Sequence, residues 1–386
     1  MHFEEKLKEW GNGLENKPIW VTAPGRINLI GEHTDYNNGY VLPAAIDKSV
    51  FFLLQQRDDK NCIIEAKDIG AQLRFSIEDN LKPSSNNWEN YFLGVLHFFK
   101  KKGKMKQGFN VIFKSDIPIG AGMSSSAALS CGFGMALNKA FNLSLKKNQI
   151  AEIAQLAEHY FVGVKCGIMD QYACMFGLEN HVLKLDCSTL KYQLQKIELG
   201  EYKLVLIDSK VKHELSSTEY NYRRDECDRA VAILKNYDGS IYTLRDVSRD
   251  HLLKFGKHLD RVAYMRCIYV IMENERVERA SQALNSNNLK LFGELLNQSH
   301  KGLAGYYEVS CDELNFLVNV SKESGQVLGS RMMGGGFGGC TINIVAESNC
   351  SSVVSTIINS YKKEFGIDAQ SYFVQIEDGC RVLDYN

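Results

Sequence analysis

A glycine- and serine-rich turn between a predicted strand and a predicted helix sets the strictest limit on the fold of this chain. Residues Gln107 to Phe113 are strand-like, and Ile117-Pro-Ile-Gly-Ala-Gly then leads into Ser124-Ser-Ser-Ala-Ala-Leu. The stretch from there through Phe141 lacks proline and is rich in Ala, Leu and Met, which predicts a long helix. The order is therefore strand, glycine turn, helix.

This turn, Gly120-Ala-Gly-Met-Ser-Ser-Ser, is suited to an anion. Glycine lets backbone N–H groups approach a ligand closely, and the first turn of a helix has unpaired N–H donors at the positive end of its dipole. Serine hydroxyls can bond phosphate oxygens or ligate Mg²⁺. The residues alone leave a plain capped turn as an equal alternative. The missing G-K-[ST] ending excludes a Walker A loop.

The rest of the chain alternates between strand-like and helix-like patterns. Short Val- and Ile-rich runs between glycine and asparagine clusters predict strands, and apolar residues at helical spacing predict helices. We expect strands and turns between Ile19 and Arg74, a helix over Trp88–Phe99, a helix capped by Asn148, a strand over Lys203–Asp208, several helices between 215 and 320, and a strand over Thr341–Val345. Together these predict a mixed α/β (α+β) chain of two lobes, which we divide into residues 1–195 and 196–386.

Charge and cysteine content exclude several classes of protein. Lys and Arg number 45 against 46 Asp and Glu, a net charge of −1, which lacks the basic footprint of a nucleic-acid binder or of a protein on anionic membranes. No apolar run approaches the roughly 18 residues of a membrane span, and Met1–Trp10 carries mixed charge, so we expect a cytoplasmic protein. The 11 cysteines include no C-x-x-C pair, so we expect reduced, mostly buried thiols.

A second glycine cluster lies near the C-terminus. Gly334, Gly336 and Gly339 fit G-x-G-x-x-G, but Thr341–Val345 alternates like a strand, whereas a dinucleotide fingerprint needs a helix there. A hydride-transfer enzyme is therefore disfavoured. Two interpretations stay open: a tight turn between strands, or a loop packed beside a ligand phosphate.

Charged side chains gather in a third segment, Pro24 to Tyr36. Arg26, Glu32, His33 and Asp35 lie within ten residues of a turn-rich stretch. Carboxylates in such a cluster can accept hydrogen bonds from pairs of sugar hydroxyls, which suits a polyhydroxylated ligand. A solvated surface turn is the alternative that the residues alone leave open.

The three segments resemble motifs of one enzyme family. Gly25-Arg-Ile-Asn-Leu-Ile-Gly-Glu-His-Thr-Asp-Tyr resembles the galactokinase signature, and Pro118–Ala128 resembles the phosphate loop of the wider GHMP small-molecule kinases. Gly334–Gly339 resembles the third motif of that family, and Cys166-Gly-Ile-Met-Asp-Gln resembles the segment with the catalytic aspartate. The resemblance runs from about Trp20 to Leu383. It implies two α/β lobes with the active site in the cleft between them.

The resemblance also implies roles for single residues in the ATP-dependent phosphorylation of the anomeric hydroxyl of galactose. Asp170 would be the catalytic carboxylate and Arg26 its cationic partner. The sugar would be held by Glu32, His33, Thr34, Asp35, Gly167 and Tyr220. The triphosphate would be cradled by Gly120, Ala121, Gly122, Met123, Ser124, Ser125 and Ser126, with Trp88 near the adenine. Mg²⁺ would be bound by Ser126 and Glu158.

Phosphoryl transfer passes through a loose transition state, so alignment and charge stabilisation matter more than activation of the nucleophile. Asp170 would act as a proton acceptor or chiefly as an electrostatic positioner, and the sequence does not separate these roles. The adjacent Arg26 would suit either role, because its permanently charged, planar group faces the developing negative charge.

Two alternatives to a galactose kinase stay open. The first is an N-acetylgalactosamine kinase or another sugar-1-kinase, and the second is a non-catalytic galactose and ATP sensor. The carboxylates of Glu32 and Asp35 argue against an anionic substrate such as mevalonate, which they would repel. We expect galactose and ATP as partners, no nucleic acid, no membrane, and a monomeric state.

Overall fold

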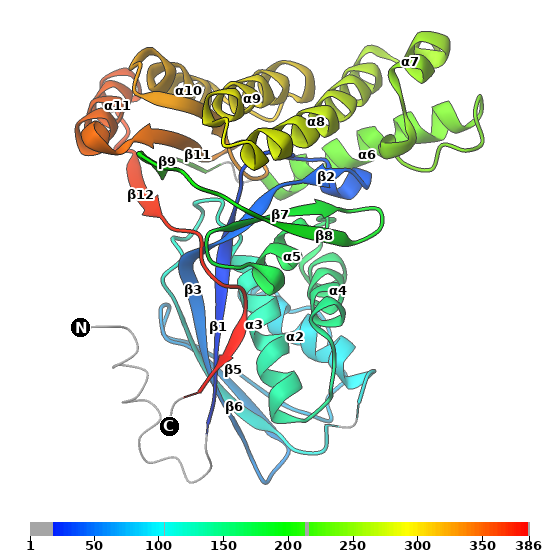
Figure 1. Ribbon diagram of the computed structural model, residues 1–386. Coiled ribbons are helices and arrows are strands. Elements are labelled where there is room, and N and C mark those ends of the chain that lie inside the picture. The colour runs from blue at the N-terminus through cyan, green and yellow to red at the C-terminus, as the bar shows by residue number, and fades with distance from the viewer. Residues whose placement is uncertain (1–17, 104, 213–215, 385–386) are drawn as a thin grey trace.

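The computed structural model describes residues 18–103, 105–212 and 216–384, and it consists of two lobes, one above the other in Figure 1. The lower lobe contains a six-stranded sheet with the order β13-β1-β3-β6-β4-β5. Its strands are β1 (Ile19–Asn28), β3 (Pro43–Gln56), β4 (Asn61–Ala66), β5 (Ala71–Ser76), β6 (Phe109–Ser115) and β13 (Arg381–Leu383). The helices of this lobe are α2 (Asn87–Lys100), α3 (Ser125–Ala140), α4 (Lys147–Ala157) and α5 (Met169–Phe176).

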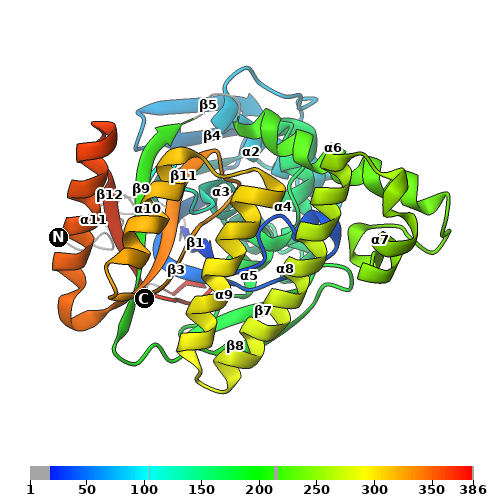
Figure 2. The same ribbon diagram turned by 90° about the horizontal axis from the view of Figure 1, so that it is seen from above.

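The upper lobe has a four-stranded sheet with the order β10-β11-β9-β12. Its strands are β9 (Tyr202–Lys212), β10 (Val327–Met332), β11 (Gly338–Ala346) and β12 (Gln370–Val374). The helices are α6 (Ser216–Lys235), α7 (Arg249–Phe255), α8 (Arg261–Asn285), α9 (Leu289–Gly302), α10 (Asp312–Glu323) and α11 (Cys350–Phe365). Figure 2 shows α8 and α9 side by side, with α7 at one edge of the molecule and α11 at the other.

A small sheet lies between the lobes in Figure 1, with the order β2-β7-β8. Its strands are β2 (Tyr40–Val41), β7 (His181–Asp186) and β8 (Lys191–Lys196). Strand β2 follows directly on the charged N-terminal segment, whose short helix η1 (Asp35–Asn37) is buried. This segment packs into the upper lobe, because Tyr36 belongs to the same apolar cluster as Tyr269 and Tyr307.

Helix α3 packs closely against the first sheet because a glycine faces the strands. A methyl group at Gly132 would lie 2.2 Å from the Phe52 ring on β3 and 2.7 Å from the Cβ of Ala23 on β1. Such distances are far inside van der Waals contact, so only glycine permits this packing. The close approach brings the N-terminus of α3, and the glycine turn before it, next to the strand that carries Arg26.

Most of the elements expected from the sequence are confirmed. The predicted helices and strands correspond to α2, α3, β6, β9 and β11, and helices fill most of the region from 216 to 323. The predicted cap at Asn148 is wrong: α4 begins at Lys147, and the Gln149 side chain accepts the backbone N–H of Lys146. The 11 cysteines are free thiols, and all but Cys166 and Cys311 are buried, as predicted.

The last strand, β13, belongs to the sheet of the lower lobe, although our division of the chain at residue 195 assigned it to the second lobe. Strand β13 pairs with β1, placing Leu383 opposite Trp20, so the chain returns from the upper lobe to the first sheet. In Figure 1 the red segment of β12 descends along this path. Met1–Trp10, whose mixed charge contributed to the expectation of a cytoplasmic protein, lies outside the described residues. In the part of the chain that is described, no helix is long and apolar enough to span a bilayer.

Candidate active site

Arg26 on β1 and Asp170 in the first turn of α5 form a two-pronged ion pair across 144 residues of sequence. Arg26 Nε donates to Asp170 Oδ1 at 2.7 Å and Nη2 donates to Oδ2 at 2.9 Å. The remaining arm, Nη1, donates to the carbonyl of Gly122 at 2.6 Å. The guanidinium thus fixes a carboxylate and the glycine turn relative to each other, as its planar fork favours.

The Asp170 carboxylate is oriented from a second side by the hydroxyl of Ser124, which donates to Oδ2. Ser124 precedes α3 in a left-handed conformation with φ of 53°. Burial acts to lower the pKa of Arg26, but the carboxylates of Asp170, Glu32 and Asp35 outweigh it and raise that pKa. The side chain of Asp170 keeps 25% of its surface exposed, so a ligand hydroxyl can reach the pair.

The two glycine segments lie against each other. Gly120 and Gly122 have φ of 78° and 69°, and the side chains of Ala121 and Met123 are buried. A methyl group at Gly334 would lie 3.5 Å from the carbonyl oxygen of Gly122. The C-terminal cluster is therefore a tight turn between β10 and β11, as the first interpretation predicted, and its position beside a ligand phosphate stays a prediction.

Ser126 and Glu158 also come together. The Ser126 hydroxyl bonds the Glu158 carboxylate, which also accepts from Gln171 Nε2 at 2.7 Å. Burial, followed by the charge of Asp170, raises the pKa of Glu158 to about 7. A buried carboxylate beside a hydroxyl offers the hard oxygen donors that Mg²⁺ prefers. Among the described residues, no group of three or more His, Cys, Asp or Glu is arranged to hold a metal ion.

Asp35, Gly167 and Tyr220 lie together beside this centre. A Cβ at Gly167 would overlap Asp35 Oδ2, so the segment before α5 passes directly over the carboxylate. Burial, and then the charge of Asp170, raises the pKa of Asp35 to about 7. The ring of Tyr220, on α6, lies 5.3 Å from that of His33. Asp35 is thus the carboxylate of the N-terminal segment that lies nearest to Gly167.

His33 has both ring nitrogens engaged within the protein. Nδ1 is 2.7 Å from the Tyr36 hydroxyl, and Nε2 is 3.1 Å from the carbonyl oxygen of Gly335. Burial lowers the pKa of His33 to about 3, so the neutral ring donates from Nε2 and accepts at Nδ1. His33 therefore joins the charged N-terminal segment to the C-terminal glycine segment.

Glu32 and Thr34 are likewise engaged within the protein. The Glu32 carboxylate accepts from Arg331 at 2.9 Å and from the backbone N–H of Gly334 at 2.7 Å, and it is 1% exposed. The Thr34 hydroxyl is buried and directed at the carbonyls of Gly31 and Tyr40. The side chains of Glu32, His33 and Thr34 are thus buried and bonded to other parts of the chain, and their predicted contacts with the sugar stay predictions.

Arg331 and Glu273 are supporting residues that sequence reasoning missed. Glu273, fully buried on α8, accepts from the backbone N–H of Gly31 at 3.0 Å and from the Ser299 hydroxyl at 2.6 Å. The position of Arg331, three residues before Gly334, is the signal that could have drawn attention to it. Trp88 packs on Phe92 and Phe113, and its place near an adenine stays a prediction.

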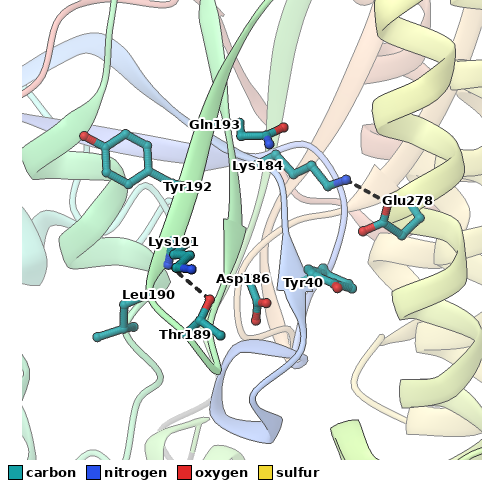
Figure 3. A pocket seen from close by; sticks show the side chains of 9 residues that line it. All are labelled: Tyr40, Lys184, Asp186, Thr189, Leu190, Lys191, Tyr192, Gln193 and Glu278. Carbon is teal, nitrogen blue, oxygen red and sulfur yellow. Dashed lines mark hydrogen bonds and ion pairs between the residues drawn. The ribbon is translucent and has the colours of Figure 1, made fainter.

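A separate cavity of about 720 Å³ lies between the β7–β8 hairpin and α8 (Figure 3). Its lining includes Tyr40, and its Lys184 is paired with Glu278 at 2.7 Å, an ion pair marked in the figure. None of the predicted site residues lines it. This cavity is therefore separate from the residues that the sequence predicts for catalysis and binding.

Three family models match segments of this chain. The description "Galactokinase galactose-binding signature" matches residues 12–56, "GHMP kinases N terminal domain" matches 90–178, and "GHMP kinases C terminal" matches 280–357. Galactokinase from Clostridium beijerinckii is 40% identical over 366 residues, which cover 94% of each chain. The chain belongs to the galactokinase family. Galactokinase from Thermosipho africanus is 42% identical over 93% of this chain and 98% of its own.

Solved structures agree with this family. The crystal structure of Lactococcus lactis galactokinase complexed with galactose superposes with a TM-score of 0.93 at 34% identity, covering 98% of both chains. Mevalonate kinase from Methanococcus jannaschii superposes with a TM-score of 0.65 at 18% identity, covering 95% of this chain, and thus shares the fold. The galactokinase family is one branch of a GHMP fold that spans both lobes, as the sequence resemblance implied.

We predict that His33 stays uncharged throughout the range in which an exposed histidine titrates. Its folded-state pKa of about 3 lies below the unfolded value near 6.5, so protonation of the unfolded chain lowers stability as pH falls from 6.5 toward 3. NMR of ¹⁵N-labelled histidine, with His33→Asn for assignment, should show no titration of this ring between pH 8 and pH 5. A ring that titrates near pH 6.5 would contradict the buried, bonded position.

Proposed function

We propose that the chain transfers the γ-phosphoryl group of ATP to the anomeric hydroxyl of galactose, giving galactose 1-phosphate and ADP. The observation that carries this proposal is the Arg26–Asp170 pair, bonded to both the glycine turn and Ser124 at the start of α3. Membership of the galactokinase family and the similarity to a galactokinase complexed with galactose support the choice of sugar.

Asp170 accepts a hydrogen bond from the reacting hydroxyl and takes its proton as the new bond to phosphorus forms. Arg26 holds the carboxylate in place through two bonds, and its fixed charge faces the negative charge that develops. Because the hydroxyl must be aligned with the phosphorus atom, the rigid fork of Arg26 contributes orientation as well as charge. Asp35, the Gly167 backbone and Tyr220 hold the other hydroxyls of the sugar.

The triphosphate binds at the turn from Gly120 to Ser126, where backbone N–H groups and the N-terminus of α3 favour an anion. Mg²⁺, bound through Ser126 and Glu158, would neutralise charge on the β and γ phosphates. The raised pKa of Glu158 supports binding of Mg²⁺ at this position. Burial makes the ionised carboxylate unfavourable, and a bound cation would stabilise it. Trp88 is proposed to lie near the adenine.

The sensor alternative is less well supported than the enzyme, because the residues proposed for catalysis are present and bonded to one another. A cytoplasmic location and a monomeric state stay predictions from the sequence.

We predict that Asp170→Asn binds ATP nearly as the wild type does and loses turnover by about 10²–10⁴-fold, the usual contribution of a positioned acid–base group. ADP release measured with a coupling system gives turnover, and calorimetry gives ATP affinity. Asp186→Asn, in the separate cavity of Figure 3, is the control and should keep full turnover. Activity of Asp170→Asn within twofold of the wild type would remove Asp170 from the mechanism.

We predict that the binding of galactose depends on pH through Asp35. The ionised Asp35 carboxylate accepts from sugar hydroxyls, and its pKa is raised to about 7. Galactose affinity, measured by calorimetry without ATP, should therefore fall as pH drops below 7, approaching tenfold per pH unit as protons compete. Asp35→Asn should bind galactose weakly with little pH dependence. Equal pH profiles for the wild type and Asp35→Asn would exclude Asp35 as the sugar acceptor.

A further inference from the structure

Arg331, the penultimate residue of β10, is a completely buried cation outside the proposed reaction centre. Nε donates to the carbonyl of Leu29 at 2.7 Å, and Nη1 donates to the carbonyl of Met332 at 2.8 Å. Nη2 donates to the carbonyl of Asn28 at 2.7 Å and to Glu32 Oε1 at 2.9 Å. This single side chain therefore joins the C-terminal end of β1, and the residues after it, to the strand that leads into the second glycine segment.

Glu32 extends this connection to the glycine segment itself. The same oxygen, Oε1, that accepts from Arg331 also accepts the backbone N–H of Gly334 at 2.7 Å. The other oxygen accepts from the Asn28 amide. A buried carboxylate depends on its cationic partner, since loss of that partner leaves an uncompensated charge. The position of Gly334 relative to the N-terminal segment is therefore set by Arg331 acting through Glu32.

These contacts form part of a closed ring around the site. Gly334 packs against Gly122, whose carbonyl accepts from Arg26 Nη1 at 2.6 Å. Arg26 lies on β1, six residues before Glu32, which bonds back to Gly334. The ring passes through both ligand-binding regions: the glycine turn on one side and the segment with Asp35 on the other. Arg331 bonds to Asn28, Leu29, Met332 and Glu32 and has no bond to Asp170, so it supports this ring without being part of the proposed reaction centre.

We propose that Arg331 is a positioning residue that holds the sugar-binding segment at the correct distance from the phosphate-binding turn. This inference rests on the proposed function, because only transfer between two bound substrates requires that distance. A displacement of about 1 Å between reacting groups can cost on the order of 10²-fold in rate. Loss of Arg331 is therefore expected to lower transfer much more than it weakens the binding of either substrate alone.

The guanidinium is needed for its shape as well as its charge. Its planar fork reaches three backbone carbonyls and one carboxylate, whereas the point charge of lysine cannot satisfy all four acceptors. Arg331→Lys therefore keeps the charge and loses the geometry. Glu32→Gln keeps the volume and an oxygen that can accept from Gly334. It removes the charge that Arg331 pairs with and puts an NH₂ group in place of the oxygen that accepts from Asn28.

The experiment measures turnover, separate dissociation constants for galactose and ATP, and the ratio of ATP hydrolysis to galactose phosphorylation. For Arg331→Lys we expect turnover at least roughly tenfold lower, both dissociation constants within about threefold of the wild type, and a raised hydrolysis ratio as water replaces a misaligned sugar. Glu32→Gln should shift the same ratio in the same direction. In the double variant the two losses of turnover should not add, because both residues act through one link.

Arg266→Met is the matched control. Arg266 is 1% exposed and bonded to Glu226 at 2.7 Å and Glu308 at 2.8 Å, in the upper lobe outside the ring. Its loss should lower the melting temperature and leave the hydrolysis ratio unchanged. If Arg331→Lys fails to fold, Glu32→Gln supplies the test.

Folded Arg331→Lys and Glu32→Gln with wild-type turnover and an unchanged hydrolysis ratio would overturn the proposal. A change in the ratio no larger than that caused by Arg266→Met would overturn it as well. Failure of the proposed function is distinguished by the wild type: it would form no galactose 1-phosphate from galactose and ATP.

Discussion

The ion pair between Arg26 and Asp170 is the interaction on which the site depends. It joins the first strand of the lower lobe to a helix 144 residues later, and the third arm of the guanidinium fixes the glycine turn. Breaking a buried pair by removing one partner typically costs about 3–5 kcal/mol, because the other charge stays buried. The close packing of α3 on β1 and β3 at Gly132 is what brings the three parts within reach.

Negative charge exceeds positive charge around this pair. Asp35, Glu158 and Asp170 lie near the Arg26 guanidinium, and the pKa values of Asp35 and Glu158 are raised to about 7, first by burial and then by Asp170. This excess of negative charge favours the binding of a cation, and the Mg²⁺ of our proposal would supply the compensating positive charge. The sugar would be bound on the Asp35 side and the phosphates at the start of α3, so charge balance and alignment depend on the same side chains.

Local patterns in the sequence predicted most helices and strands. The sequence could not show which residues far apart in the chain contact each other. Apolar spacing predicted α2, and the glycine turn predicted the start of α3, because both depend on neighbouring residues. The sequence drew attention to the charged N-terminal segment, but Arg331 and Gly335, which bond Glu32 and His33, lie about 300 residues away. The return of β13 to the first sheet was missed for the same reason.

The most direct measurement of the central claim is a crystal structure of the chain with galactose and a non-hydrolysable ATP analogue in the presence of Mg²⁺. The account predicts the anomeric hydroxyl within hydrogen-bonding distance of the Asp170 carboxylate and the terminal phosphate against the turn from Gly120 to Ser126. Galactose bound elsewhere, for example in the cavity beside Lys184, with Asp170 still paired only to Arg26 and Ser124, would contradict it.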